Sequence, residues 1–201
     1  RTIELFQTRV RDGSPHRPDR TYRYRPPVTP LPVQAGPPIG GRNWDLTAVV
    51  DRAPGDEGVL FATGTENSGL SVFVQDGRLV LDYNCFGDHH IVESAETVPE
   101  GRTELGVSFR KRAFGDLGRA GADATITIDG RPVGDLEVPF AMFVMSSLGP
   151  SIGHDHGSPV SDRYRSGFAF TGVLHEVVVE LVSARADTDA AGEERAAMGR
   201  Q

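Results

Sequence analysis

The chain has 201 residues and a formal net charge of −7, which disfavours nucleic acid or an anionic membrane surface as a partner. Its length suits one large all-β domain with appendages. The 24 glycines and 14 prolines favour many turns and short strands over long helices.

Cysteine content and hydropathy limit the protein class further. The single cysteine, Cys85, excludes an internal disulfide and provides no zinc-ligand spacing. No stretch approaches the roughly 18 consecutive apolar residues of a membrane span. The first residues, Arg1-Thr-Ile-Glu-Leu-Phe, lack the layout of a signal peptide, so we expect a cytoplasmic protein.

Residues 1–43 are rich in arginine and proline and differ from the rest of the chain. The run P-P-V-T-P-L-P is incompatible with helix and cannot donate hydrogen bonds inside a sheet. We therefore predict an extended linker arm over 1–43, with a short edge strand at Thr21–Tyr24. The arginines between Arg9 and Arg25 are interrupted by acidic residues, which favours packing against another domain of the same polypeptide.

Residues 44–182 have the patterning of an antiparallel β-sandwich, and 183–201 that of a frayed or disordered tail. Asp76-Gly77 and Asp129-Gly130 each separate two alternating runs, as in two-residue hairpins. The expected strands are Asp45–Asp51, Gly58–Thr63, Leu70–Gln75, Arg78–Asn84, His90–Ser94, Glu104–Arg110, Ala124–Ile128, Arg131–Val138, Ile152–Gly153 and Thr171–Leu181.

The string I-G-H-D-H-G-S-P-V-S-D-R-Y forms a polar loop before the last strand. His154, Asp155 and His156 in this loop are weak candidates for a metal site, although neighbouring side chains of an extended chain point to opposite faces. Calcium would instead take oxygens from Asp155 and Asp162. The alternative is a polar turn in which Asp155 caps its own backbone.

Other side chains could take part in catalysis or binding, but each of them also has a simpler structural explanation. Cys85 has His89 and His90 nearby in sequence, yet it fits equally well as a small apolar core residue. Glu176 and Glu180 share one strand face like glycosidase carboxylates, but a solvent face opposite His175, Val177, Val179 and Leu181 explains them better. The aromatic side chains that could form a sugar-stacking platform, or pack in the core, are Trp44, Tyr83, Phe86 and Tyr164.

Several ordered strings closely resemble the C-terminal region of large bacterial arylsulfatases. They are G-V-L-F-A-T-G, S-V-F-V-Q-D-G-R-L-V-L-D-Y-N-C-F-G, T-I-T-I-D-G-R-P-V-G, the 152–164 loop and F-T-G-V-L-H-E-V-V-V-E-L. The resemblance extends over roughly Tyr22 to Leu181. Those enzymes hydrolyse sulfate esters with a formylglycine, formed in a Cys-x-Pro-x-Arg type motif, beside a calcium ion. No such motif occurs here, since Phe86, Gly87 and Asp88 follow Cys85.

The resemblance implies an accessory sandwich of the jelly-roll or laminin-G (concanavalin-like) type that packs on a sulfatase catalytic domain. It implies no catalytic residue and no cofactor in this chain, with calcium expected only in the catalytic domain. A homo-oligomer is a further possible assembly. The alternative is a lectin-like module that binds glycans at its rim loops, for which Asp155, Tyr164 and Asp88 are the first candidates.

Overall fold

The computed structural model describes residues 21–28, 30–39, 42–112, 120–141 and 148–182. The predicted tail over 183–201 and residues 1–20 of the predicted arm lie outside these ranges. No helix with the length and hydropathy of a membrane span occurs in the described part of the chain. The described helical structure is a single 3-10 turn, η1, at Val33–Ala35.

Every strand expected from the alternating pattern is present, with ends displaced by at most a few residues. The strands are β1 (Thr21–Tyr24), β2 (Asn43–Arg52), β3 (Gly58–Thr65), β4 (Ser68–Gln75), β5 (Arg78–Cys85), β6 (Asp88–Glu93), β7 (Gly101–Lys111), β8 (Ala122–Ile128), β9 (Arg131–Val138), β10 (Ser151–Ile152) and β11 (Val173–Val182).

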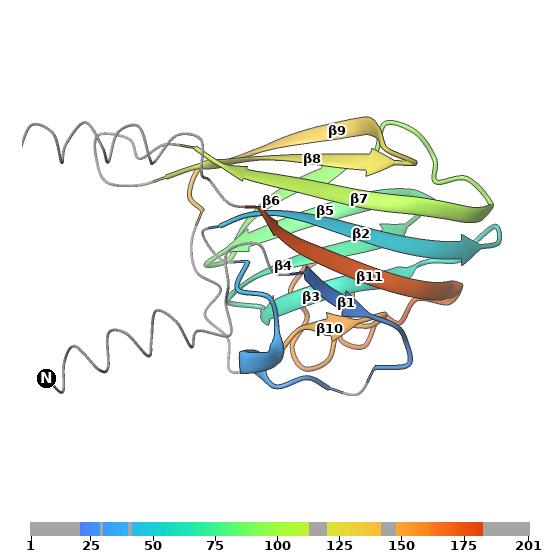
Figure 1. The fold of residues 1–201 in the computed structure, drawn as a ribbon, viewed down its shortest axis with the longest axis horizontal. Helices are drawn as coiled ribbons and strands as arrows, with labels where there is room; N and C mark the ends of the chain where they lie inside the picture. Colours follow the sequence, from blue (N-terminus) through green and yellow to red (C-terminus); the bar gives the residue numbers. More distant parts are fainter. Residues whose placement is uncertain (1–20, 29, 40–41, 113–119, 142–147, 183–201) are drawn as a thin grey trace, which may run out of the picture.

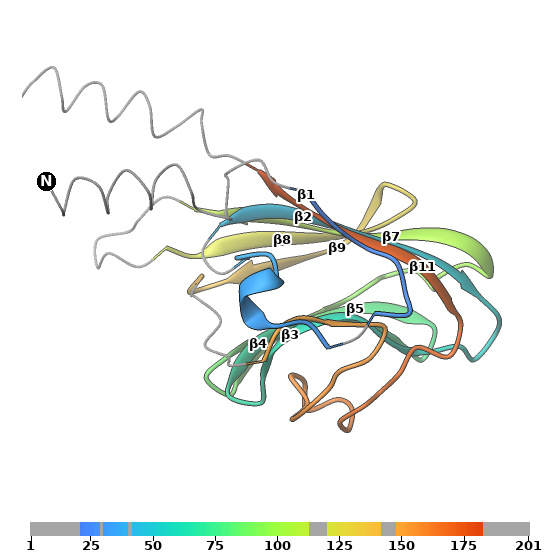
Figure 2. The same ribbon diagram turned by 60° about the horizontal axis from the view of Figure 1, so that its bottom comes forward.

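Two antiparallel sheets pack face to face, as Figures 1 and 2 show. The larger sheet has the strand order β1-β11-β2-β7-β8-β9, and the smaller has the order β10-β3-β4-β5-β6. The last strand of the chain thus lies between the first two, because β11 pairs with both β1 and β2. The predicted antiparallel β-sandwich is confirmed.

Alternation along β2 illustrates how the strands form the core between the sheets. Its inward side chains, from Trp44 to Val50, are almost fully buried, whereas the residues between them are partly exposed. Trp44 stacks on Phe109 with ring centroids 5.1 Å apart, and Tyr83 stacks on the same ring at 5.8 Å. A sugar-stacking platform containing Trp44 and Tyr83 is therefore wrong, because both rings are buried in the core.

Both hairpins predicted from Asp-Gly pairs are confirmed. Asp76 and Gly77 have φ values of 51° and 72°, and Asp129 and Gly130 have values of 49° and 73°. Two successive residues of positive φ match the twist that joins adjacent antiparallel strands. A third turn of this kind places Phe86 at φ 56°, where a bulky side chain is unusual.

Part of the predicted linker arm belongs to the sandwich. Tyr22 of β1 is opposite Val179 of β11, and Tyr22 and Tyr24 are only 5% and 9% exposed. The described sandwich therefore begins at residue 21 rather than 44. The predicted edge strand at Thr21–Tyr24 is confirmed, because β1 ends the larger sheet.

The last strand follows its predicted pattern except at Val178, which is buried although it lies between Glu176 and Glu180, and at His175. Val177, Val179 and Leu181 are buried as expected. A bulge between Leu174 and Glu176 shifts the register. His175 consequently does not continue the buried face: its Nε2 atom lies 2.6 Å from a carboxylate oxygen of Asp51.

A second, smaller core covers the outer face of the five-stranded sheet. Val160, Tyr164 and Phe168, from the segment between β10 and β11, pack against Phe73 and Val80 of that sheet. The Phe73 and Tyr164 rings meet edge to face at 5.1 Å. The segment 153–172 therefore forms a third layer over this part of the sandwich.

Candidate functional site

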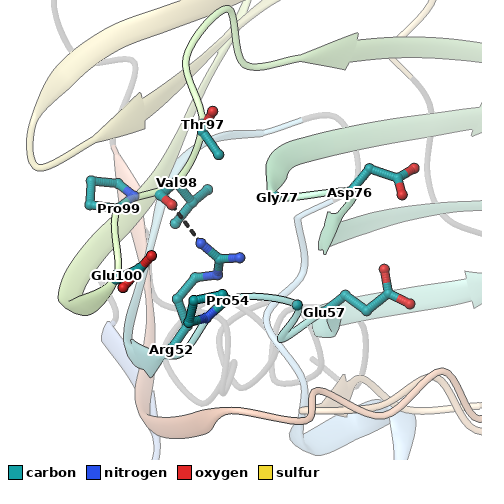
Figure 3. Close-up of a pocket in the computed structure, with 10 residues that line it drawn as sticks. Arg52, Pro54, Glu57, Asp76, Gly77, Thr97, Val98, Pro99 and Glu100 are labelled. Carbon is teal, nitrogen blue, oxygen red and sulfur yellow. Dashed lines mark hydrogen bonds between the residues drawn. The ribbon is translucent and has the colours of Figure 1, made fainter.

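A pocket of about 520 Å³ opens at one end of the sandwich. Three connections form its walls: the β2–β3 loop, the β4–β5 turn and the β6–β7 loop. Figure 3 shows Arg52 in the middle of the opening, between Val98 on one side and Gly77 on the other. The chain connections of three separate strand pairs thus converge on one arginine.

Arg52 is the last residue of β2 and occupies an inward position of that strand, so its side chain is only 7% exposed. Its Nη1 atom donates a hydrogen bond of 2.6 Å to the carbonyl of Val98, and Nε donates one of 3.4 Å to the carbonyl of Asp56. Among the described residues, Nη2 has no hydrogen-bond acceptor. A buried guanidinium thus offers one remaining donor nitrogen to the pocket.

The rim around Arg52 combines carboxylates with apolar surface. Glu57 and Asp76 lie on one side of the opening, and Glu100 lies on the other (Figure 3). Pro54 and Pro99 provide apolar walls. The pocket therefore offers hydrogen-bond acceptors at its edge, a donor at its centre and nonpolar surface between them.

The loop below this opening is held by Asp56. Its Oδ2 atom accepts a 2.7 Å hydrogen bond from the backbone N–H of Ala53, and its Oδ1 atom accepts one of 3.0 Å from the Thr171 hydroxyl. These two bonds lower the pKa of Asp56 below its ordinary value. The two bonds therefore connect the loop to Thr171 and favour the ionised form of Asp56.

Asp155 and Tyr164, which the sequence offers as glycan contacts, are buried beneath the 153–172 segment at 1% and 8% exposure. The Tyr164 hydroxyl is hydrogen-bonded to Ser71 Oγ and to Asp155 Oδ2, both at 2.7 Å. The same carboxylate oxygen accepts a bond from the backbone N–H of Val160, which is the predicted capping role of Asp155. Direct contact of these two side chains with a glycan is incompatible with this burial, and they fasten the segment to the sheet instead.

The predicted metal cluster is not assembled. His154 directs Nδ1 to the carbonyl of Ile152 at 3.1 Å, while Nδ1 of His156 contacts the Ser151 hydroxyl. The Asp155 carboxylate is instead bound by the Tyr164 hydroxyl and the Val160 N–H. Within the described ranges, no group of three or more histidine, cysteine or acidic side chains has a geometry that could hold a metal ion.

Asp88 and Phe86 remain exposed at the tip of the β5–β6 hairpin. Phe86 is 61% exposed, and it is the one member of the proposed aromatic platform that solvent reaches. The tip lies at the end of β5 opposite the 76–77 turn, so Asp88 does not join the Arg52 pocket.

Cys85 and the neighbouring histidines do not form an activated thiolate. Burial, and secondarily the charge of Asp88, raise the pKa of the Cys85 thiol, whereas a nucleophilic cysteine needs a lowered one. His89 Nδ1 instead lies 2.9 and 3.0 Å from the two carboxylate oxygens of Asp82, a fully buried residue. Burial raises the pKa of Asp82, and bonds to Ser161 and His89 oppose that change.

Glu176 and Glu180 project from the solvent face, as predicted. Glu176 accepts a 2.5 Å hydrogen bond from Arg23, and this bond, assisted by the charge of Arg23, lowers the pKa of Glu176 below its ordinary value. A glycosidase acid requires a raised pKa. Glu176 therefore lacks the electrostatics of a catalytic acid.

A second pocket of about 360 Å³ lies beside the start of the chain's described part. Its lining is mainly apolar and includes Pro26, Pro27, Phe170 and Leu174. Of the described residues that line it, His154 is the one with a titratable side chain. It offers fewer polar groups than the Arg52 pocket, which we therefore take as the candidate site.

Sequence reasoning missed Arg52, although a signal was present. The inward positions of β2 run Trp44, Leu46, Ala48, Val50 and then Arg52. An arginine at the next inward-facing position of such a strand needs hydrogen-bond acceptors that are also buried. It therefore indicates a polar site at the end of the strand.

The sequence matches no family model and no curated protein. Solved structures are similar in fold. The CBM40 module of Ruminococcus gnavus IT-sialidase aligns with a TM-score of 0.51 and 9% identity, covering 73% of this chain and 81% of that one. The same module bound to α2,3 sialyllactose aligns with a TM-score of 0.50 and 8% identity, covering 73% of this chain and 80% of that one. The LG1-3 region of the laminin α2 chain aligns with a TM-score of 0.52 and 16% identity, covering 81% of this chain and 30% of that one.

At these identities the likeness establishes the fold alone. The chain is an all-β antiparallel sandwich of the jelly-roll and laminin-G type, as the sequence predicts. These sialidase and laminin structures are not sulfatases, so they add no support to the sulfatase resemblance.

Proposed function

We propose that this chain is a lectin-like module that binds a glycan in the Arg52 pocket. The observation that carries the proposal is the pocket's composition: a buried guanidinium with one donor nitrogen to spare, surrounded by carboxylates and proline surface. Sugar hydroxyls both donate and accept hydrogen bonds, and sugar ring faces pack on nonpolar groups. The lining matches each of these needs.

The size and position of the pocket also support this function. A volume of about 520 Å³ falls within the roughly 300–1,000 Å³ of small-molecule sites. The pocket lies among loops at the end of a sandwich, where rigid strands hold variable connections. One structure of similar fold is a sialidase CBM40 module bound to sialyllactose, which supports a glycan ligand by fold-level analogy.

Calorimetric titration of the chain with a panel of neutral, amino and acidic oligosaccharides tests the proposal. We expect at least one sugar to bind, and Arg52→Lys to weaken its binding by about ten-fold, because lysine keeps the charge but loses the planar fork. Arg110→Lys is the matched control. Arg110 also donates to a backbone carbonyl, that of Trp44, but its position on β7 is remote from the pocket.

Binding that is unchanged by Arg52→Lys, in a variant whose circular dichroism and melting temperature match the wild type, would exclude this pocket. The absence of binding to every sugar in the panel would exclude the function. A variant that fails to fold is replaced by Thr97→Val, which removes a rim hydroxyl from an exposed position.

We propose, as a second candidate, an accessory domain of an arylsulfatase that packs on the catalytic domain. The supporting observation is that two of the strings that carry the resemblance meet in space. Asn84, from D-Y-N-C-F-G, donates 3.0 Å to the carbonyl of Val160, from the 152–164 loop. Ser71, from S-V-F-V-Q-D-G, contacts Tyr164 of the same loop. The strings therefore describe one interlocked substructure rather than unrelated strand patterns.

The test of the second candidate is the mass of the native polypeptide in its source cell, detected with an antibody to this chain. A species several times larger than 21.7 kDa that hydrolyses p-nitrophenyl sulfate supports an arylsulfatase. A species of about 21.7 kDa that co-purifies with no sulfatase activity contradicts it. The two candidates are compatible, because an accessory domain can also bind the glycan part of a substrate.

A further inference from the structure

We infer that the Arg52 pocket selects amino sugars and rejects sialylated or sulfated ones, an inference that rests on the proposed glycan-binding function. Two features of the pocket support this preference: the charge of its lining and the hydrogen bonds that already occupy Arg52. Among the described residues that line the pocket, Arg52 is the single cation, and the acids are Glu57, Asp76 and Glu100. The formal charge of the lining is therefore −2, from three carboxylates and one guanidinium.

Arg52 is poorly arranged to hold an anion. Arginine binds carboxylates and sulfates best as a fork, through two parallel N–H groups. Here Nη1 is committed to the carbonyl of Val98 at 2.6 Å and Nε faces the carbonyl of Asp56. Nη2 alone remains for a ligand among the contacts of the described residues. A two-point contact with an anion would therefore have to share Nη1 or Nε with a carbonyl that the nitrogen already contacts, whereas a neutral hydroxyl or ring oxygen can bind to Nη2 by itself.

The carboxylates are arranged to attract a cation. Glu57 and Asp76 extend from different loops on the same side of the opening, and Glu100 stands on the opposite side (Figure 3). Asp56 precedes Glu57 in the same loop, and its contacts with the Ala53 N–H and the Thr171 hydroxyl stabilise its ionised form. A protonated amine in the pocket is thus surrounded by negative charge, and an anion in the same place is repelled.

Two matched pairs of oligosaccharides test the inference by titration at about pH 6, where a sugar amine carries its proton, and at about 50 mM salt, where screening is weak. The first pair is a trimer of glucosamine and its fully N-acetylated form. The second pair is lactose and α2,3-sialyllactose. We expect the glucosamine trimer to bind about ten-fold more tightly than the acetylated trimer, and lactose to bind more tightly than sialyllactose.

Equal affinities within each pair, or the reverse order, would overturn the inference while leaving glycan binding intact. No binding by any of the four sugars, nor by others in the wider panel, would remove the proposed function and the inference with it. The first pair differs at three amines, which acetylation leaves uncharged, and the second differs by one sialic acid residue that carries a carboxylate. The two pairs therefore test opposite signs of charge, and only a preference for the cation together with a rejection of the anion agrees with the inference.

Charge-neutralising variants then locate the effect. Asp76→Asn and Glu100→Gln alter exposed side chains, and each should reduce the preference for the glucosamine trimer by about three-fold if its charge lies about 7 Å from the amine in a water-like medium. Glu180→Gln is the matched control, because Glu180 is an exposed carboxylate on β11, remote from the lining. A loss of preference in the control equal to that in the pocket variants would show that the effect comes from overall charge.

Discussion

Replacing Tyr164 with phenylalanine tests the role of the buried network that fastens the 153–172 segment to the sheet. The substitution keeps the ring that packs edge to face on Phe73 and removes only the hydroxyl. That hydroxyl is hydrogen-bonded to Ser71 Oγ and Asp155 Oδ2 at 2.7 Å each. Ser71 and Asp155 are 0% and 1% exposed, so water cannot replace the lost partner without opening the segment.

The expected destabilisation follows from these two contacts. A hydrogen bond to a charged group contributes about 1.5–3 kcal/mol, and leaving a buried neutral hydroxyl unsatisfied costs about 1–3 kcal/mol. Asp155 keeps its bond from the Val160 N–H, which limits the loss. We therefore expect the free energy of unfolding to fall by about 3 kcal/mol, equivalent to about 9 °C in melting temperature for a chain of this size.

The destabilisation caused by Tyr164→Phe should also depend on pH, which a simple packing defect would not explain. Burial raises the pKa of Asp155 above its ordinary value, and the Tyr164 hydroxyl opposes that rise. An acid whose pKa is raised in the folded state binds its proton more readily when folded, so stability falls as pH rises from about 4, the ordinary aspartate value. Removing the hydroxyl should steepen this fall, and Tyr164→Phe should therefore be more destabilising at neutral than at acidic pH.

Urea unfolding of the wild type, Tyr164→Phe, Ser71→Ala and the double variant measures both quantities. Because Ser71 and Tyr164 are in contact, the double variant should be more stable than the sum of the single losses predicts. If the free energy of unfolding of Tyr164→Phe were within about 0.5 kcal/mol of the wild-type value at both pH values, the network would not hold the 153–172 segment on the sheet. A change of that size is the usual effect of a surface substitution.

The other substitutions test the strands, a turn and a carboxyl group. Val179→Asp should lower stability by about 3–5 kcal/mol in urea unfolding, because Val179 is 0% exposed and the new charge has no partner; an unchanged midpoint would contradict the buried face of β11. Phe86→Asn should increase the free energy of unfolding by about 1 kcal/mol and so raise the melting temperature, because asparagine tolerates the φ of 56° at this turn. A lower melting temperature would mean that Phe86 makes a stabilising contact. Asp155→Asn should flatten the decline of stability with rising pH above about 4, and an unaltered pH profile would assign that decline to other groups.

The strands were predictable from the sequence because their signals are local. A strand of a sandwich alternates between core and solvent, and β2 has this alternation from Asn43 to Arg52. Asp76-Gly77 and Asp129-Gly130 each fix a hairpin because their positive φ values belong to the turn itself. These features need no distant part of the chain, so the sequence sufficed to identify them.

The candidate site was not predictable because its parts are distant in sequence. Three separate parts of the chain form the site, and packing of the two sheets against each other brings together Arg52, Gly77 and Val98. Asp155 and Tyr164 are polar and lie in a segment that contains several glycines and serines, which favours an exposed loop. Their burial depends on the segment folding back over Phe73 and Val80, a contact that local composition does not encode.

The sequence by itself determined the strands, the tight turns and the sandwich class, because each depends on the periodicity of side chains or on the backbone preference of single residues. Only the tertiary structure decided that β11 inserts between β1 and β2 and that Arg52 faces a pocket. Register between distant strands and the burial of a polar side chain depend on long-range packing, in which distant segments supply the acceptors and the apolar cover.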